Sequence, residues 1–236
     1  NPNLTFKQMK EIIIAAGDGK LEGTEKTDGQ NLFITYDIQT QSARAARNKG
    51  NLRSGGLDAA GLASKFAGRG SVEAAFNDAF SIFEQAISSL SAKEIKKVFQ
   101  PLGPRYQVYY NAEIQDPRNA NVINYDTKTL NVHRVGHIKY DRQEDEVSSI
   151  DLSKESKFIE TVLSRMQRAV ANQDFRIQMN AIRNLKELDN KEPVRVALAA
   201  LEKAIDDAGI SDNDTVGEYL IARIVPVIQS YVQLPP

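Results

Sequence analysis

The chain has 236 residues, no cysteine, two histidines and a formal net charge of −1, with 41% hydrophobic and 26% charged residues. This composition is ordinary for a folded globular protein, and it excludes disulfides, thiolate metal sites, cysteine nucleophiles and a surface that is basic throughout. No run is long and apolar enough to cross a bilayer, and the first residues lack a signal-peptide pattern, so we expect a cytoplasmic protein without a membrane partner.

Helical and β patterns alternate in the first 140 residues. The Asp28-Gly29 dipeptide is typical of tight hairpins, so the strands on either side of it are expected to pair. Three glycines predict a loop over 50–56. The predicted helices cover 6–16, 57–66, 71–90 and 91–101, and the predicted strands cover 21–26, 31–38, 42–47, 106–114 and 129–138.

The pattern changes after Asp141. An acidic stretch at 141–151 reads as a solvated linker, and the remaining residues favour helices. These helices are predicted over 154–171, 175–188, 193–208 and 215–231. We therefore expect two domains, an α+β domain over 1–150 and a helical bundle over 151–236 that is either an insertion or an appended domain.

The run Glu25-Lys26-Thr27-Asp28-Gly29 presents a lysine just before the strand at 31–38. A lysine that attacks the α-phosphorus of a nucleotide must lose its proton, and cations must neutralise the polyphosphate. A neighbouring glycine lets the backbone approach the nucleotide closely. Lys26 is therefore the candidate catalytic residue.

Residues further along the chain supply the other groups that this chemistry needs. Arg47 and Lys49 end the strand at 42–47 and are candidate phosphate ligands. Glu113 lies between apolar positions of a strand, where an unpaired carboxylate is costly. A bound ribose or metal would satisfy Glu113, and so would a structural pair with Arg118 or Lys139.

This order of motifs resembles the adenylation domain of ATP-dependent RNA and DNA ligases and mRNA capping enzymes, and it is most similar to phage-type RNA ligases. The resemblance covers about residues 20–140. It implies an α+β fold with an antiparallel-sheet nucleotidyltransferase core, of the ATP-grasp-like ligase type, followed by an all-helical region. It also implies that Lys26 takes AMP from ATP with Mg²⁺ or Mn²⁺ and passes it to a nucleic-acid 5′-phosphate end. The nucleotide-binding residues that it implies are Glu25, Asp28, Gly29, Arg47, Lys49 and Glu113.

Two elements of that family, a later Glu-Gly strand and a final Lys-x-Lys strand, are not recognisable in this chain, and the sequence identifies no metal ligand. Either these strands lie beyond Pro236, or the protein is a catalytically incomplete, ligase-derived module that binds a protein partner through its helical region. The second alternative allows a place in a virus particle, whereas the first places a phage-encoded enzyme in the cytoplasm of its host. Transfer of GMP from GTP to RNA ends is a third alternative.

Other conspicuous residues have simpler interpretations. His133 and His137 lie on one face of a predicted strand, and two imidazoles alone make a poor metal site, so we expect structural histidines. Phe76, Phe80 and Phe83 form a stripe at helical spacing that predicts a core face. The basic, glycine-rich run at 65–70 lacks the spacing of a P-loop and is expected to be a loop.

Overall fold

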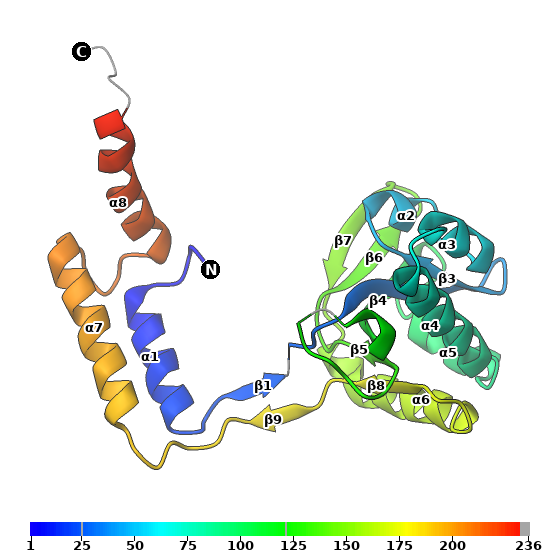
Figure 1. The fold of residues 1–236 in the computed structure, drawn as a ribbon. Coiled ribbons are helices and arrows are strands. Elements are labelled where there is room, and N and C mark those ends of the chain that lie inside the picture. The colour runs from blue at the N-terminus through cyan, green and yellow to red at the C-terminus, as the bar shows by residue number, and fades with distance from the viewer. Residues whose placement is uncertain (25, 121, 232–236) are drawn as a thin grey trace. The chain divides into compact units, whose positions relative to one another are not determined.

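The computed structural model describes residues 1–24, 26–120 and 122–231 (Figure 1). The chain forms two compact units: unit 1 comprises residues 1–24 and 182–236, and unit 2 comprises residues 25–181. The division differs from the expected boundary near residue 150. The reason is that helix α6 (Ser156–Ala169) packs on the sheet of unit 2 and strand β8 (Arg176–Met179) is part of that sheet.

Unit 2 is built on a seven-stranded sheet in which β3, β2, β4, β5 and β8 follow one another, while β6 joins β4 and β7 joins β6. The pairs are antiparallel except for β5 with β8, which is parallel, so the sheet is mixed rather than antiparallel as expected. Besides β8, the strands are β2 (Gln30–Asp37), β3 (Ser42–Ala46), β4 (Tyr106–Gln115), β5 (Thr129–Val132), β6 (His137–Asp141) and β7 (Glu146–Ile150).

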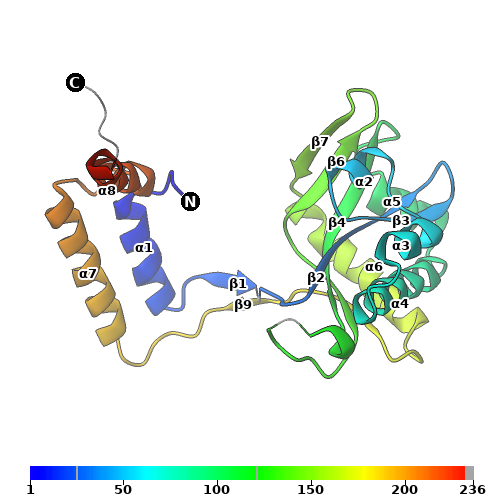
Figure 2. The same ribbon diagram turned by 45° about the horizontal axis from the view of Figure 1, so that its top comes forward.

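Helices cover one face of this sheet (Figure 2). These helices are α3 (Ala59–Phe66), α4 (Ser71–Ile87), α5 (Ala92–Phe99) and α6. The short α2 (Lys49–Arg53) begins where Asn48 caps the backbone N–H of Asn51, and it lies on the other face of the sheet. The aromatic stripe of α4 is fully buried in the main core, which confirms its predicted role.

The two faces of the sheet differ in chemistry because successive side chains of a strand point to opposite faces. Leu32, Ile34, Ala112, Ile114 and Leu130 lie in the core with the helices. Their neighbours in the strands lie on the opposite face and are polar, except for Phe33, which packs on a smaller apolar cluster. This cluster around Tyr109 and Leu52, with the β6–β7 hairpin, covers one end of that polar face.

The described residues of unit 1 form three helices and a two-stranded ribbon. The ribbon pairs β1 (Glu22–Thr24) with β9 (Ile182–Asn184) in antiparallel register. Helix α1 (Phe6–Gly17) starts at a capping box formed by Thr5 and Gln8 and packs against α7 (Glu192–Ala208). Helix α8 (Val216–Tyr231) follows, and the rings of Phe6 and Tyr219 meet edge to face with their centroids 5.7 Å apart.

Several predicted elements differ in the structure. Residues 175–188, predicted as a helix, form β8 and β9, so the expected all-helical region after residue 150 contains strands. Residues 50–53 of the predicted glycine loop at 50–56 belong to helix α2. The acidic stretch 141–151 contains β7, which forms a hairpin with β6. The strand predicted over 129–138 is divided into β5 and β6 by a turn at Gly136, whose φ of +77° suits glycine.

Among the helices in the described part of the chain, none has the length and apolar character needed to cross a membrane. The other predicted helices at 6–16, 57–66, 71–90, 91–101, 154–171, 193–208 and 215–231 are confirmed to within a few residues.

Candidate functional site

A row of polar side chains crosses four strands on the face of the sheet opposite the helices. Asn31 of β2 lies directly opposite Glu113 of β4, Glu113 lies opposite Asn131 of β5, and Asn131 lies beside Gln178 of β8. Residues paired in this way project from the same face of a sheet. The sheet therefore gathers residues from four distant segments into one polar surface.

The turn that carries Lys26 packs against this row. Gly29 lies so close to β4 that a Cβ atom at this position would be 2.4 Å from the backbone oxygen of Ile114 and 3.0 Å from Cγ of Glu113. Only glycine allows the turn to approach β4 this closely. The approach brings the turn to the side chain of Glu113, while Lys26 itself has an exposed side chain. The expected hairpin between 21–26 and 31–38 does not form, because β1 pairs with β9 instead.

Thr27 and Asp28 fix the turn on two sides. The buried hydroxyl of Thr27 accepts hydrogen bonds from the side-chain amides of Asn131 and Asn180, each at 3.1 Å. The carboxylate of Asp28 accepts the backbone N–H groups of Val122 and Ile123 at 2.6 and 2.7 Å. Asp28 thus has a structural task in holding the segment before β5, and its contact with a nucleotide stays a prediction.

Two arginines share an aromatic support formed by Phe66 and Phe76. The rings of Phe66 and Phe76 are stacked at 4.0 Å, with the guanidinium of Arg47 5.1 Å from the Phe76 ring and that of Arg69 5.6 Å from the Phe66 ring. Arg47 also donates a hydrogen bond to the backbone oxygen of Asn31, at the start of the polar row.

The charge of Arg47 is poorly compensated in this position. Burial lowers the pKa of Arg47 below its usual value, Glu113 opposes that change, and the positive charge of Arg69 adds to it. Stacking on aromatic faces stabilises a guanidinium but does not neutralise it. An anion is therefore the group that this pair of arginines is suited to bind.

Glu113 is partnered by a histidine rather than by Arg118 or Lys139. Its Oε2 lies 3.3 Å from Nε2 of His133, with 13% of the glutamate side chain and 18% of the histidine side chain exposed. Nδ1 of His133 lies 3.4 Å from the amide nitrogen of Asn180. Hydrogen-bonded contacts therefore run from Thr27 through Asn180 and His133 to Glu113, which ties the Lys26 turn to the carboxylate.

His137 lies beneath this surface as a structural residue, as expected. It is 1% exposed, and its Nδ1 accepts the backbone N–H of Asn111 at 3.2 Å. Burial, with a smaller contribution from the charge of His133, lowers the pKa of His137 to about 4. His137 is therefore neutral at physiological pH.

The polar face also contains a buried acceptor that no described residue satisfies, Oδ1 of Asn131. Asn131 is 6% exposed and lies opposite Glu113. Buried polar atoms are normally hydrogen-bonded, so this atom is suited to receive a donor such as a ligand hydroxyl or amino group.

A resident metal centre does not fit the donors on this surface. In the described ranges, no group of three or more histidine, aspartate or glutamate side chains is placed to hold a metal ion. Mg²⁺ usually binds through one or two carboxylates together with substrate phosphates. A requirement for Mg²⁺ or Mn²⁺ therefore stays a prediction, and the metal ligands stay unassigned.

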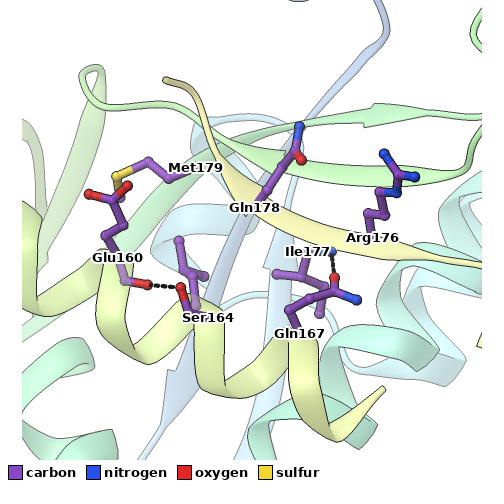
Figure 3. Close-up of a pocket in the computed structure, with 8 residues that line it drawn as sticks. Glu160, Ser164, Gln167, Arg176, Ile177, Gln178 and Met179 are labelled. Atoms are coloured by element: carbon purple, nitrogen blue, oxygen red, sulfur yellow. Dashed lines mark hydrogen bonds between the residues drawn. The ribbon is translucent and has the colours of Figure 1, made fainter. Parts of the chain in front are cut away.

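A separate groove of about 400 Å³ lies between α6 and the edge strand β8 (Figure 3). Gln167 of α6 accepts the backbone N–H of Ile177 there, which satisfies a donor at the open edge of the sheet. Figure 3 shows Ile177 directed towards α6, whereas Arg176 and Gln178 point away from it. The groove is thus part of the helix side of the sheet and contains none of the predicted site residues.

The structure brings together some of the predicted site residues and not others. Gly29 and Glu113 lie at the polar row, next to the turn of Lys26, whereas Arg47 bonds to the backbone oxygen of Asn31 and stacks on Phe76. Lys49 is exposed at the first position of α2, and Glu25 lies outside the described residues.

Sequence reasoning missed three contributors, Arg69, Asn131 and Asn180. The alternation of polar residues at 129, 131 and 133 was a visible sign of a polar strand face, and it points to Asn131. Asn180 was hidden by the wrong helix prediction for 175–188. Arg69 belongs to a run that was read as a loop, and its closeness to Arg47 depends on the packing of Phe66 on Phe76.

No protein-family model, curated protein or solved structure matches this chain, so the residues of this site carry the functional inference.

Proposed function

We propose that the protein is an ATP-dependent nucleotidyltransferase of the polynucleotide-ligase type, with Lys26 as the nucleophile. The observation that carries the proposal is the convergence of three distant sequence elements on the strands that form the polar row. The Lys26 turn packs on Glu113 through Gly29, and Arg47 donates to the backbone oxygen of Asn31, the residue opposite Glu113. A nucleotidyl transfer needs a nucleophile, phosphate-binding cations and a ribose ligand within one site.

The chemistry proceeds in two transfers. In the first, Nζ of Lys26 forms a bond to the α-phosphorus of MgATP, the bond from that phosphorus to the bridging oxygen breaks, and pyrophosphate leaves. In the second, an oxygen of a nucleic-acid 5′-phosphate attacks the same phosphorus, and the bond to Lys26 breaks. The lysine is regenerated and AMP is joined to the strand end. The oxygen of a 3′-hydroxyl then attacks the phosphorus of the 5′-phosphate and loses its proton, AMP leaves, and the strand is sealed.

Each neighbouring group has a defined part in this proposal. Arg47 and Arg69 bind phosphate oxygens, since neither stacked guanidinium forms an ion pair with a carboxylate of the described residues. Glu113 accepts hydrogen bonds from ribose hydroxyls, and Oδ1 of Asn131 is available to a further ligand donor on the same face. Electrostatic stabilisation and positioning are the main sources of rate enhancement in such transfers.

The test is intact-mass analysis after incubation with ATP, and separately with GTP, in the presence of Mg²⁺ or Mn²⁺. We expect an AMP adduct on the wild type that disappears when pyrophosphate is added, and none on Lys26→Ala. Lys93→Ala, which removes an exposed lysine of α5, is the matched control and should retain the adduct. A GMP adduct instead would show that the nucleotide donor is GTP rather than ATP.

Failure to form any adduct would refute the enzymatic proposal for this chain. Binding of nucleotide without an adduct would then favour the alternative of a ligase-derived binding module. In that case the protein partner would be sought through unit 1, which contains the helices α1, α7 and α8.

A further inference from the structure

Lys26 lies in a segment that is not part of a paired strand. Strand β2 begins at Gln30, and residues 26–29 lie outside the regular strands. In the sequence, this turn follows shortly after Thr24, which ends the first segment of unit 1. A nucleophile in such a segment needs side-chain contacts to define its position, because a misplacement of about 1 Å can reduce a rate about 100-fold.

Thr27 makes the contacts that meet this need. Thr27 is 5% exposed, and its hydroxyl accepts from two amides that come from separate elements, Asn131 of β5 and Asn180 at the end of β8. Asn180 is itself fixed, because its backbone N–H donates to the oxygen of Val132 at 3.0 Å and its backbone oxygen accepts from Nε of Arg134.

We propose that Asn131 and Asn180 are positioning residues that hold Lys26 in its reactive place by clamping the hydroxyl of Thr27. The inference rests on the proposed function as far as the reaction is concerned, but the clamp itself is a property of the fold. Asn180 also contacts His133, the partner of Glu113. The clamp therefore sets the lysine turn and the carboxylate relative to each other.

The first measurement is hydrogen exchange of peptides that contain residues 26–29, which requires no activity. Thr27→Val keeps the size of the side chain and removes the acceptor, and Thr27→Ser keeps the hydroxyl. Thr35→Val is the matched control, since Thr35 is a buried threonine of β2 whose hydroxyl bonds to the oxygen of Val108 at 2.6 Å. We expect exchange in this turn to rise about tenfold or more in Thr27→Val only, as local opening becomes easier.

The second measurement separates positioning from nucleotide binding. In Thr27→Val and in Asn180→Ala, the rate of adduct formation at saturating MgATP should fall about tenfold or more, whereas the affinity for MgATP should change less than about threefold. Thr27→Ser should restore the rate. Because both variants interrupt the same clamp, the rate of adduct formation in the double variant should be little lower than in either single variant.

The two proposals fail in distinguishable ways. If the wild type forms no adduct with any nucleotide, the proposed function fails and hydrogen exchange alone decides the clamp. If Thr27→Val shows wild-type exchange in residues 26–29, or if it forms adduct at the wild-type rate, the clamp is refuted. A fall in rate that is matched by an equal loss of MgATP affinity also refutes positioning.

Discussion

Acidification should destabilise the protein through His137, and the size of the effect follows from its burial. The pKa of His137 falls from 6.5 to about 4 in the folded protein because burial disfavours its charged form. The unfolded chain therefore binds a proton between these two pH values that the folded chain does not, so stability decreases as the pH falls. Between pH 7 and pH 5 the linkage relation gives a loss of about 2 kcal/mol from this one residue.

The assay is urea unfolding at pH 7 and pH 5, followed by circular dichroism. His137→Asn is the informative variant, since an asparagine oxygen can still accept the backbone N–H of Asn111 but does not titrate. Its loss of unfolding free energy between the two pH values should be smaller than that of the wild type by about 2 kcal/mol. Carboxylates titrate equally in both proteins, so the difference isolates His137. Equal pH dependence in the two proteins would refute the reasoning.

Three further substitutions test the surroundings of Lys26. Gly29→Ala should lower the free energy of unfolding by about 1–3 kcal/mol and lower the thermal midpoint, because its methyl group would overlap β4. The control Gly50→Ala should not destabilise the protein, because the nearest atom there is the end of a side chain at 3.3 Å. An unchanged thermal midpoint in Gly29→Ala would contradict the close packing. Asp28→Ala should release residues 122–125 and speed their cleavage by chymotrypsin, whereas Asp126→Ala should leave the digestion pattern unchanged. In a competition titration, Arg69→Gln should weaken MgATP binding by about fivefold and leave AMP binding nearly unchanged. A fivefold change corresponds to the loss of one charged contact of about 1 kcal/mol. An equal effect on both nucleotides would place Arg69 away from the β- and γ-phosphates.

Helix α8 has an exposed apolar surface. Its apolar side chains are exposed along its length, among them Leu220, Ile221 and Ile224. Helices with apolar residues on several sides are usually buried. This surface is consistent with the expectation of a protein partner for the helical region, which stays a prediction.

Local patterns in the sequence determined most helices and several strands. Helix α4 was predictable because Phe76, Phe80 and Phe83 repeat at helical spacing, and α5 because Ser91 and Glu94 form a capping box. Strand β2 was predictable from its alternation. These signals depend on contacts within a few residues, so a single sequence contains them.

Pairing between distant segments was decided only by the tertiary structure. Residues 176–179 alternate like a strand, yet their environment of helix-favouring residues led to a helix prediction, and only the place beside β5 and under α6 selects the strand. The partner of β1 is likewise a segment 160 residues away in sequence, as the pairing of Glu22 with Asn184 and Thr24 with Ile182 shows.

The candidate site divides in the same way. The motif around Lys26, the basic residue Arg47 and the strand carboxylate Glu113 were visible as chemistry in the sequence. Their convergence was not, because it depends on the antiparallel register that sets Glu113 opposite Asn31 and on the close approach that Gly29 permits. The clamp on Thr27 was invisible as well, since its two amides lie more than 100 residues away along the chain and meet only when β5 and β8 pair in parallel.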